Sequence, residues 1–517
     1  MSVVVVSDIL RENLATQPEA DAIVLDGGGC TWAQLYRRAC KVANGLVDAG
    51  VGVGDRIAFL DKNSIEYFEV LFGATLVNAV LVAVNWRLAP PEIEYIINDA
   101  DAGVLVVHSD FAEQLAAFAP NLTTVTTILV IGDAGKLRSY EEWVESQVDT
   151  DPHGDGGPDD VALQLYTSGT TGLPKGAQLT NQNFNALLTA AASWDMDTSS
   201  VSIAAMPLFH IGGSGWSLFG MAKGAKTVLL RELDPSKLLE LITEEKATHA
   251  FFVPAVLQFL LLMPQDGIDL SSMKLIVYGA SPITQEILVK SMEQFGCEYM
   301  QVYGLTETTG AVTQLEPSDH DASGAKAHLL RAAGKPLPGV EIKIVDTDTG
   351  DEVGDGVVGE VWIKSPTNMI GYWKMPDATA EALPGGGWFC TGDAGFMDDG
   401  YLFLHDRVKD MIISGGENVY PAEIENVLMS HDAVADAAVI GVPSQKWGET
   451  PKAIIVAAPG ATVDAAELIG YCKERLAGFK CPTSVDLVES IARNPSGKIL
   501  KRELRAPYWE GHERAVN

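Results

Sequence analysis

The sequence is poor in cysteine. Its 517 residues include only six cysteines, and none of them forms a C-x-x-C pair or joins a Cys/His cluster with the spacing of a zinc site. A disulfide-stapled scaffold and a structural zinc fold are therefore excluded. A reduced, cytoplasmic protein is the simplest prediction.

Long apolar runs are also missing. No run approaches the ~18 residues that a membrane helix needs, and the short apolar stretch 3–6 has no basic region before it, unlike a signal peptide. We therefore predict no integral membrane segment. Apolar residues still make up 47% of the chain, which is ample for a large core spread over more than one domain.

Basic residues are scarce: 36 Lys and Arg face 69 Asp and Glu, which gives a formal net charge of −33. Most of this charge lies before Asp406, because the remainder carries 13 basic and 16 acidic residues. Such a field disfavours nucleic acid and anionic lipid as partners. We therefore predict no nucleic-acid partner.

The periodicity of the sequence predicts an α/β fold. Residues 31–50 have helical spacing behind a Thr31 cap. Strand-like runs such as 56–60 and 104–107 then alternate with helical stretches, which indicates mainly parallel sheets flanked by helices. Between residues 339 and 403, short alternating runs separated by Gly/Asp turns predict an antiparallel β subdomain.

A short charged segment near residue 406 predicts a joint between domains. We expect a large N-terminal domain at 1–405, a hinge at 406–411 and a small α/β C-terminal domain at 412–517. Residues 507–517 are predicted to form a frayed tail.

The loop 166–176 reads Tyr-Thr-Ser-Gly-Thr-Thr-Gly-Leu-Pro-Lys-Gly and follows an alternating strand-like run. Its glycines let backbone N–H groups approach an oxyanion, its hydroxyls add donors, and Lys175 adds a positive charge. These features predict a cradle for phosphate. It is not a Walker A loop, because Leu173 and Pro174 separate Gly172 from the lysine.

Five further segments carry polar groups at strand ends or in loops. Glu307 in 303–308 offers oxygen ligands for Mg²⁺, and Asp393 in 389–393 offers a carboxylate for the two hydroxyls of a ribose. The others are the small-residue exit 279–282, Arg407, and the loop 494–498 that ends in Lys498. Taken alone, each also fits an ordinary turn or a surface salt bridge.

In this order and spacing the segments resemble the adenylate-forming superfamily of acyl-CoA synthetases, peptide-synthetase adenylation domains and luciferases. The resemblance covers essentially the whole chain. The run 406–421, Asp-Arg-Val-Lys-Asp-Met-Ile-Ile-Ser-Gly-Gly-Glu-Asn-Val-Tyr-Pro, is most similar to bacterial fatty-acyl-CoA and aryl-CoA synthetases. The resemblance implies an ATP-dependent, AMP-forming acid–thiol ligase that uses Mg²⁺ and CoA. It also implies that 1–405 is the AMP-binding domain and that the small C-terminal domain at 412–517 is mobile.

The resemblance also implies roles for individual residues. ATP and AMP would be bound by Thr167, Ser168, Gly169, Thr170, Thr171, Gly172, Lys175, Gly279, Ala280, Ser281, Gln301, Tyr303, Gly304, Asp393 and Arg407. Catalysis would involve His210, Thr306, Glu307 and Lys498, and the metal ion would lie near Thr167 and Glu307. Lys409 takes the hinge position, and the pantetheine arm of CoA would pass Ser414, Gly415 and Gly416.

The acid is predicted to be hydrophobic. The segment 207–216, which corresponds to the family's acyl pocket, has no aspartate to pair with the ammonium of an amino acid. The expected pocket walls are apolar or small, namely Trp216, Val253, Ala255, Gly310 and Val312. A fatty acid is the first choice, and an aryl acid such as a cinnamate or benzoate is the second.

Other readings stay open. A fatty acyl-AMP ligase that loads a carrier protein is disfavoured, because no obvious blocking insertion lies between residues 339 and 406. A non-catalytic nucleotide-binding module is disfavoured by the intact Lys498, Glu307 and Asp393. The expected small-molecule partners are the acid, ATP and CoA, and a homodimer is an open alternative.

Overall fold

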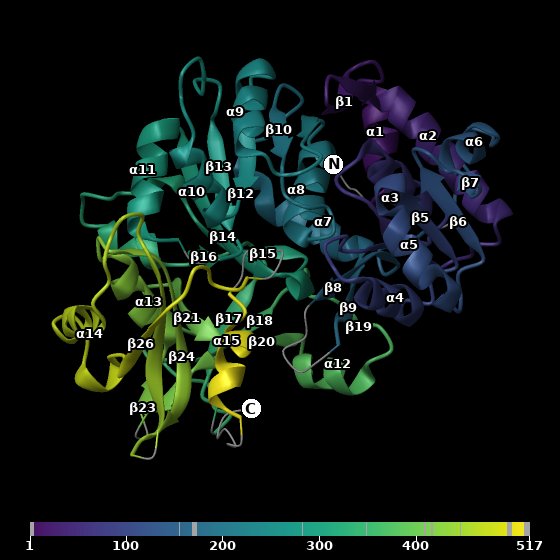
Figure 1. The fold of residues 1–517 in the computed structure, drawn as a ribbon. Helices are drawn as coiled ribbons and strands as arrows, with labels where there is room; N and C mark the ends of the chain where they lie inside the picture. Colours follow the sequence, from purple (N-terminus) through teal and green to yellow (C-terminus); the bar gives the residue numbers. More distant parts are fainter. Residues whose placement is uncertain are drawn as a thin grey trace.

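The computed structural model describes residues 5–154, 156–167, 173–281, 283–347, 349–407, 410–414, 417–444, 446–493 and 499–510 (Figure 1). In Figure 1 the purple and blue N-terminal part lies beside the teal part, and the yellow-green C-terminal part lies below the teal part. Within the described ranges no helix combines the length and the apolarity that crossing a membrane requires.

The first large sheet has eight strands. Its order is β19 (Gly371–Tyr372), β9 (Lys175–Thr180), β8 (Val161–Thr167), β4 (Val80–Ala83), β3 (Arg56–Leu60), β5 (Val104–His108), β6 (Thr127–Ile131) and β7 (Arg138–Ser139). The pairs from β8 to β7 are parallel, and β9 and β19 add antiparallel pairs at one edge. The N-terminal helices are α1 (Asp8–Thr16), α2 (Trp32–Asp48), α3 (Ile65–Leu76), α4 (Pro90–Asp99), α5 (Ala112–Phe118) and α6 (Tyr140–Glu145).

The second large sheet has nine strands. Its order is β16 (Lys335–Pro336), β15 (Gly310–Leu315), β14 (Glu298–Leu305), β13 (Leu275–Gly279), β12 (His249–Phe252), β10 (Val201–Ala204), β11 (Lys226–Leu229), β1 (Asp21–Leu25) and β2 (Gly28–Thr31). The pairs from β14 to β1 are parallel. Its part of the chain contributes α7 (Asn181–Ala190), α8 (Ile211–Ala222), α9 (Pro235–Glu244), α10 (Pro254–Leu262) and α11 (Gln285–Phe295).

The start of α2 shows how local sequence sets an element. Thr31 Oγ1 accepts from the backbone N–H of Gln34, and the Gln34 side chain accepts from the backbone N–H of Thr31. This reciprocal capping box satisfies N–H groups that a helix start leaves unpaired. The predicted cap is therefore confirmed.

The predicted antiparallel β subdomain is present. It consists of β17 (Glu341–Val345), β18 (Gly359–Lys364), β20 (Trp388–Asp398) and β21 (Tyr401–Arg407), all paired antiparallel, and α12 (Pro376–Ala382) precedes β20. Its core includes Val312, Ile344, Val361 and Leu402.

The C-terminal domain is a smaller α/β unit. Its sheet has the order β23 (Glu417–Val419), β22 (Ile412–Ser414), β25 (Gly448–Ala457) and β24 (Val434–Ser444), with β26 (Ser484–Leu487) parallel to β25. Its helices are α13 (Pro421–Met429), α14 (Ala465–Lys473) and α15 (Lys501–Arg505). The predicted fold class is thus confirmed, whereas the exact boundaries at 405 and 411 stay a prediction.

The chain after α15 corrects the prediction of a frayed tail. Tyr508 donates its hydroxyl to the Asp486 carboxylate, and the Trp509 indole N–H donates to the carbonyl of Gly441 at 2.9 Å. Two aromatic side chains that bury apolar surface and also find acceptors hold this stretch to the domain. Residues 511–517 lie outside the described part.

Candidate active site

The candidate site lies where the two large sheets meet. Strand β8 ends at Thr167 in one sheet, and β14 of the other sheet runs into the 3₁₀ turn Thr306–Thr308. The Thr167 hydroxyl donates to Oε1 of Glu307 at 3.4 Å. The predicted pair is therefore brought together at the carboxyl ends of parallel strands, where open α/β sheets bind their ligands.

Tyr372 belongs to the same cluster, although the sequence did not reveal it. Its hydroxyl donates to the same Glu307 oxygen at 2.9 Å, and Lys175 Nζ lies 5.0 Å from the centre of its ring. The residue reaches this position because β19 pairs with β9, opposite Ala177. A two-residue strand has no periodicity that could have predicted this placement.

The second carboxylate oxygen of Glu307 accepts no hydrogen bond from the described residues, and only 9% of the residue is exposed. Carboxylate and hydroxyl oxygens are the ligands that Mg²⁺ takes, with few from protein. Within the described ranges no three His, Cys, Asp or Glu side chains gather into a metal site. A magnesium ion here would therefore take its other ligands from phosphate and water.

Tyr166, just before the phosphate loop, anchors the end of β8. Its hydroxyl donates to Oδ2 of Asp99 at 2.6 Å. Burial, together with this hydrogen bond, raises the pKa of Tyr166 well above its usual value. The phenol therefore stays a donor, and the chain entering the loop is fixed to α4.

A second polar pair lies on the β-subdomain side. The Tyr303 hydroxyl donates to Oδ2 of Asp393 at 2.6 Å, which joins β14 to β20. In the register of the antiparallel pair β20–β21, Asp393 stands opposite Arg407, whose side chain lies outside the described set. The aromatic residue, the carboxylate and the backbone of the predicted arginine thus gather as expected for a nucleoside site.

Gln301 precedes this tyrosine by two positions on β14. Its side-chain oxygen is buried and has no hydrogen-bond partner among the described residues. Buried acceptors without partners are rare in folded proteins. An acceptor left in this position fits the exocyclic amino group of an adenine ring.

The predicted strand exit 279–281 comes close to the next strand. A Cβ atom on Gly279 would overlap the carbonyl oxygen of Val302, so glycine is required there. Ala280 follows with a φ of +67°, a conformation that costs energy for a residue with a side chain. This strained exit turns the backbone toward an apolar cavity.

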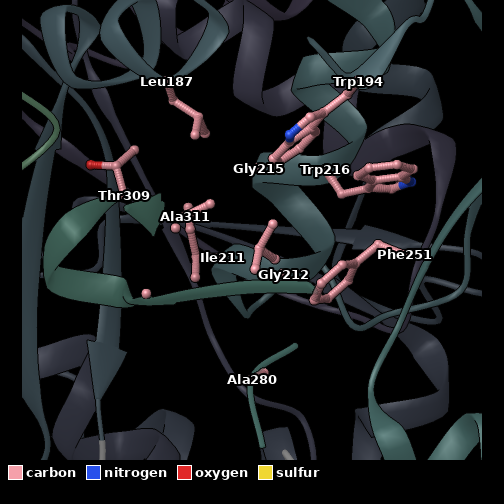
Figure 2. Close-up of a pocket in the computed structure, with 13 residues that line it drawn as sticks. Leu187, Trp194, Ile211, Gly212, Gly215, Trp216, Phe251, Ala280, Thr309 and Ala311 are labelled. Atoms are coloured by element: carbon pink, nitrogen blue, oxygen red, sulfur yellow. The ribbon is translucent and has the colours of Figure 1, made fainter. Parts of the chain in front are cut away.

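The apolar cavity lies beside these groups (Figure 2) and encloses about 550 Å³, including the part open to solvent. It is lined by Leu187, Trp194, Ile211, Gly212, Gly215, Trp216, Phe251, Ala280, Val302, Gly304, Thr309, Gly310 and Ala311. Two predicted pocket residues, Trp216 and Gly310, are among them, whereas Leu187, Trp194 and Phe251 had not been foreseen.

Three predicted pocket residues are not among those that line this cavity. Val312 is fully buried in the core of the β subdomain. It follows Ala311 on β15, and successive strand residues point to opposite faces. Val253 and Ala255 flank the first residue of α10 and are not among the lining residues.

His210 stands at the entrance to α8, as the residue before its first turn. Its ring lies 4.5 Å from the ring of Phe209, and its backbone leads directly into Ile211 and Gly212 of the cavity lining. Thr306 begins the 3₁₀ turn that carries Glu307. Ser414 ends β22 and is 6% exposed.

The remaining predicted residues lie outside the described part of the chain. They are Ser168, Gly169, Thr170, Thr171 and Gly172 of the phosphate loop, Lys409 of the hinge, Gly415 and Gly416 of the CoA segment, and Lys498. Their roles stay predictions.

Known proteins are similar to this chain in both sequence and fold. The profile of the AMP-binding enzyme family matches residues 10–373, and that of the AMP-binding enzyme C-terminal domain matches residues 423–498. The chain is 41% identical over 512 residues to a fatty acid–[acyl-carrier-protein] ligase of Streptomyces coeruleorubidus, which covers 97% of this chain and 96% of the relative. It is 37% identical over 495 residues to a feruloyl-CoA synthase of an Amycolatopsis species, with coverage of 94% and 96%. A solved anthranilate CoA ligase in complex with anthranoyl-AMP superimposes with a TM-score of 0.90 at 29% identity, over 98% of both chains.

Proposed function

This chain belongs to the AMP-binding enzyme family of acid–thiol ligases, and from that premise we propose that it activates a hydrophobic carboxylic acid with ATP and transfers the acyl group to CoA. The first product is an acyl-adenylate, formed with release of pyrophosphate. The thioester and AMP follow.

The observation that carries this proposal is the position of the apolar cavity. Thr309 and Gly310 line it and lie within three residues of Glu307. An acid whose apolar part fills the cavity would therefore place its carboxylate next to the Thr167–Glu307 pair. Acid and phosphate would meet in one place, which is what joining them requires.

The chemistry follows from the poor reactivity of a carboxylate, whose oxide is a bad leaving group. Attack of the carboxylate on the α-phosphorus of ATP forms the acyl–phosphate bond and breaks the bond to pyrophosphate. The sulfur of CoA then attacks the acyl carbon, and AMP leaves with the former acid oxygen. The first step thus converts a poor leaving group, oxide, into a good one, AMP, and the second step expels that AMP as the C–S bond forms.

Each residue of the site would have a role that depends on its position. Glu307 and Thr167 would hold Mg²⁺, which supplies positive charge to the crowded phosphates. Lys175 would neutralise phosphate from β9, Thr306 would contact the α-phosphate, and Asp393 would accept the ribose hydroxyls. Lys498 would approach the α-phosphate from the C-terminal domain.

The acceptor has a specific second candidate. The relative that is 41% identical is named a ligase for an acyl-carrier protein, so a carrier-bound pantetheine thiol is the alternative to CoA. Both thiols carry the same pantetheine arm, and the Gly415–Gly416 segment would pass either of them. The acid is a fatty acid or an aryl acid, and relatives of both kinds match the chain.

The proposal is tested with a panel of aliphatic and aryl acids incubated with ATP, Mg²⁺ and either CoA or a pantetheinylated carrier protein. We expect acid-dependent release of pyrophosphate, with AMP and a thioester formed in equal amounts. Formation of ADP and phosphate, or pyrophosphate release that does not depend on the acid, would contradict the proposed reaction. The acceptor is the thiol that accelerates AMP release.

A further inference from the structure

We propose that Trp194, fixed by Gln314, closes the inner end of the apolar cavity and sets the length of the acid. The preferred substrate is then an aryl acid or a short aliphatic acid whose apolar part ends at this indole, and long-chain fatty acids are excluded. The inference rests on the proposed function and specifies its substrate class.

Trp194 forms a wall that belongs to a packed aromatic group. It ends the 3₁₀ segment Ala191–Trp194 that continues α7, and the next residue, Asp195, turns the chain with a φ of +48°. Its ring lies 4.8 Å from that of Phe219 and 5.8 Å from that of Trp216. Figure 2 shows Trp194, Trp216 and Phe251 along one side of the space, with Leu187 on the other.

Hydrogen bonds fix this wall. The Trp194 indole N–H donates to Oε1 of Gln314 at 3.0 Å, and the Trp216 indole N–H donates to the carbonyl of Ile203 at 2.9 Å. Trp194 is 4% exposed, so swinging it aside would strip a buried N–H of its acceptor. These hydrogen bonds therefore keep both indoles in place when a longer acyl chain contacts them.

Gln314 is itself held from both sides. Its amide nitrogen donates to Ser193 Oγ at 3.0 Å and to Glu316 Oε1 at 2.5 Å. Because the amide donors are used in these bonds, the oxygen faces the indole. Gln314 is thus a positioning residue that acts through Trp194.

Gln314, which holds the indole, also lines a second hollow. The lining of this hollow is mixed and consists of Thr189, Ala190, Ala192, Ser193, Gln314, Glu316, Asp319, Lys335, Pro336 and Pro338. An apolar tail that passed Trp194 and reached this hollow would lie beside Glu316, Asp319 and Lys335 and hinder their hydration. These three charged groups add to the length limit that the indole sets.

The test compares kcat/KM for cinnamic and hexanoic acids with kcat/KM for dodecanoic and hexadecanoic acids. In the unchanged protein we expect the short and aryl acids to be preferred. In Trp194→Ala the ratio of kcat/KM for long acids to kcat/KM for short acids should rise roughly 10- to 100-fold. Gln314→Leu should shift the ratio in the same direction by less.

Trp143→Ala serves as the matched control, because this indole is equally buried, at 3% exposure, but belongs to α6 and the N-terminal core. Its length ratio should stay unchanged. If Trp194→Ala fails to fold, Trp194→Leu and Gln314→Leu provide the same comparison. A long-chain optimum in the unchanged protein, an unaltered ratio in the Trp194 and Gln314 variants, or an equal shift in Trp143→Ala would overturn the inference. Absence of pyrophosphate release with every acid would instead overturn the proposed function.

Discussion

At the scale of single residues, the site depends on groups that come from different sheets. Glu307 receives the hydroxyls of Thr167 and Tyr372 on one oxygen. These donors orient the carboxylate and leave its other oxygen without a hydrogen-bond donor among the described residues. We therefore expect the charge of Glu307, more than its shape, to determine the rate of the first reaction.

Glu307→Gln keeps the shape and removes the charge. We expect kcat for pyrophosphate release to fall about 10²–10³-fold, because the transition state loses electrostatic stabilisation through the metal. Tyr372→Phe, which removes one hydroxyl and leaves the carboxylate, should have a much smaller effect. Equal losses in both variants, or full activity of the Glu307→Gln variant at low Mg²⁺, would contradict the role.

The Tyr303–Asp393 pair makes a separate prediction. Asp393→Ala removes a charged acceptor for the ribose and should raise KM for ATP about 10- to 100-fold. Tyr303→Phe keeps the ring and loses only the hydroxyl that donates to the carboxylate, so its rise should be smaller. Steady-state kinetics with varied ATP measures both. An unchanged KM in the alanine variant would remove the ribose assignment.

Sequence alone predicted part of this site. Thr167, Glu307, Tyr303 and Asp393 stand at strand ends with marked chemistry, and the structure brings them together in two pairs. Tyr372 escaped prediction because its position depends on a two-residue strand pairing. Val312 was misplaced because one step along a strand reverses the face, and the sequence did not specify which face of β15 lined the cavity.

At the scale of elements, periodic segments were predicted well. The helix α2 has a capping signal and an apolar stripe in its own sequence, and β8 has strict alternation, so both could be read locally. The 3₁₀ extension that carries Trp194 could not be read in this way. Its position follows from contacts with Phe219 and Gln314, which lie far along the chain.

Strand β12 carries a prediction about acid sensitivity. Burial of His249 at its first residue, aided by the nearby Lys274, lowers the imidazole pKa from 6.5 to about 4. Between these pH values the imidazole is protonated in the unfolded chain and neutral in the folded chain. The free energy of unfolding therefore decreases as pH falls from about 6.5 to 4. His249→Gln should flatten that loss.

Urea unfolding at several pH values between these limits provides the measurement. The difference in unfolding free energy between pH 7 and pH 4.5 should be smaller in His249→Gln than in the unchanged protein. Thr243→Ser, a conservative change on α9, should leave the slope as it is. Identical slopes for the unchanged and His249→Gln proteins would contradict the assignment.

At the scale of the whole molecule, the C-terminal domain meets the β subdomain through an aromatic contact. The rings of His405 on β21 and Tyr420 before α13 stack at 4.8 Å. This contact joins the two parts next to the predicted hinge. Both domains were predicted from local sequence patterns. The contact between the two rings was not predicted, because it forms between residues of separate units.

The two half-reactions should be separable by substitutions in the C-terminal domain. Lys498→Ala should abolish acyl-adenylate formation and spare thioester formation from supplied acyl-adenylate, because in the proposed mechanism its charge acts at the α-phosphate in the first step alone. Gly416→Leu should do the reverse by filling the path of the pantetheine arm. Parallel assays of each half-reaction decide the matter, and equal loss of both steps in either variant would contradict the division.

The central claim is that the acid attacks the α-phosphorus of ATP, and the fate of the acid's own oxygen tests it most directly. A carboxylic acid labelled with oxygen-18 in both carboxyl oxygens is turned over with ATP and CoA, and the products are analysed by mass spectrometry. We expect each AMP to carry one labelled oxygen and pyrophosphate to carry none. Label in inorganic phosphate, or AMP without label, would contradict it.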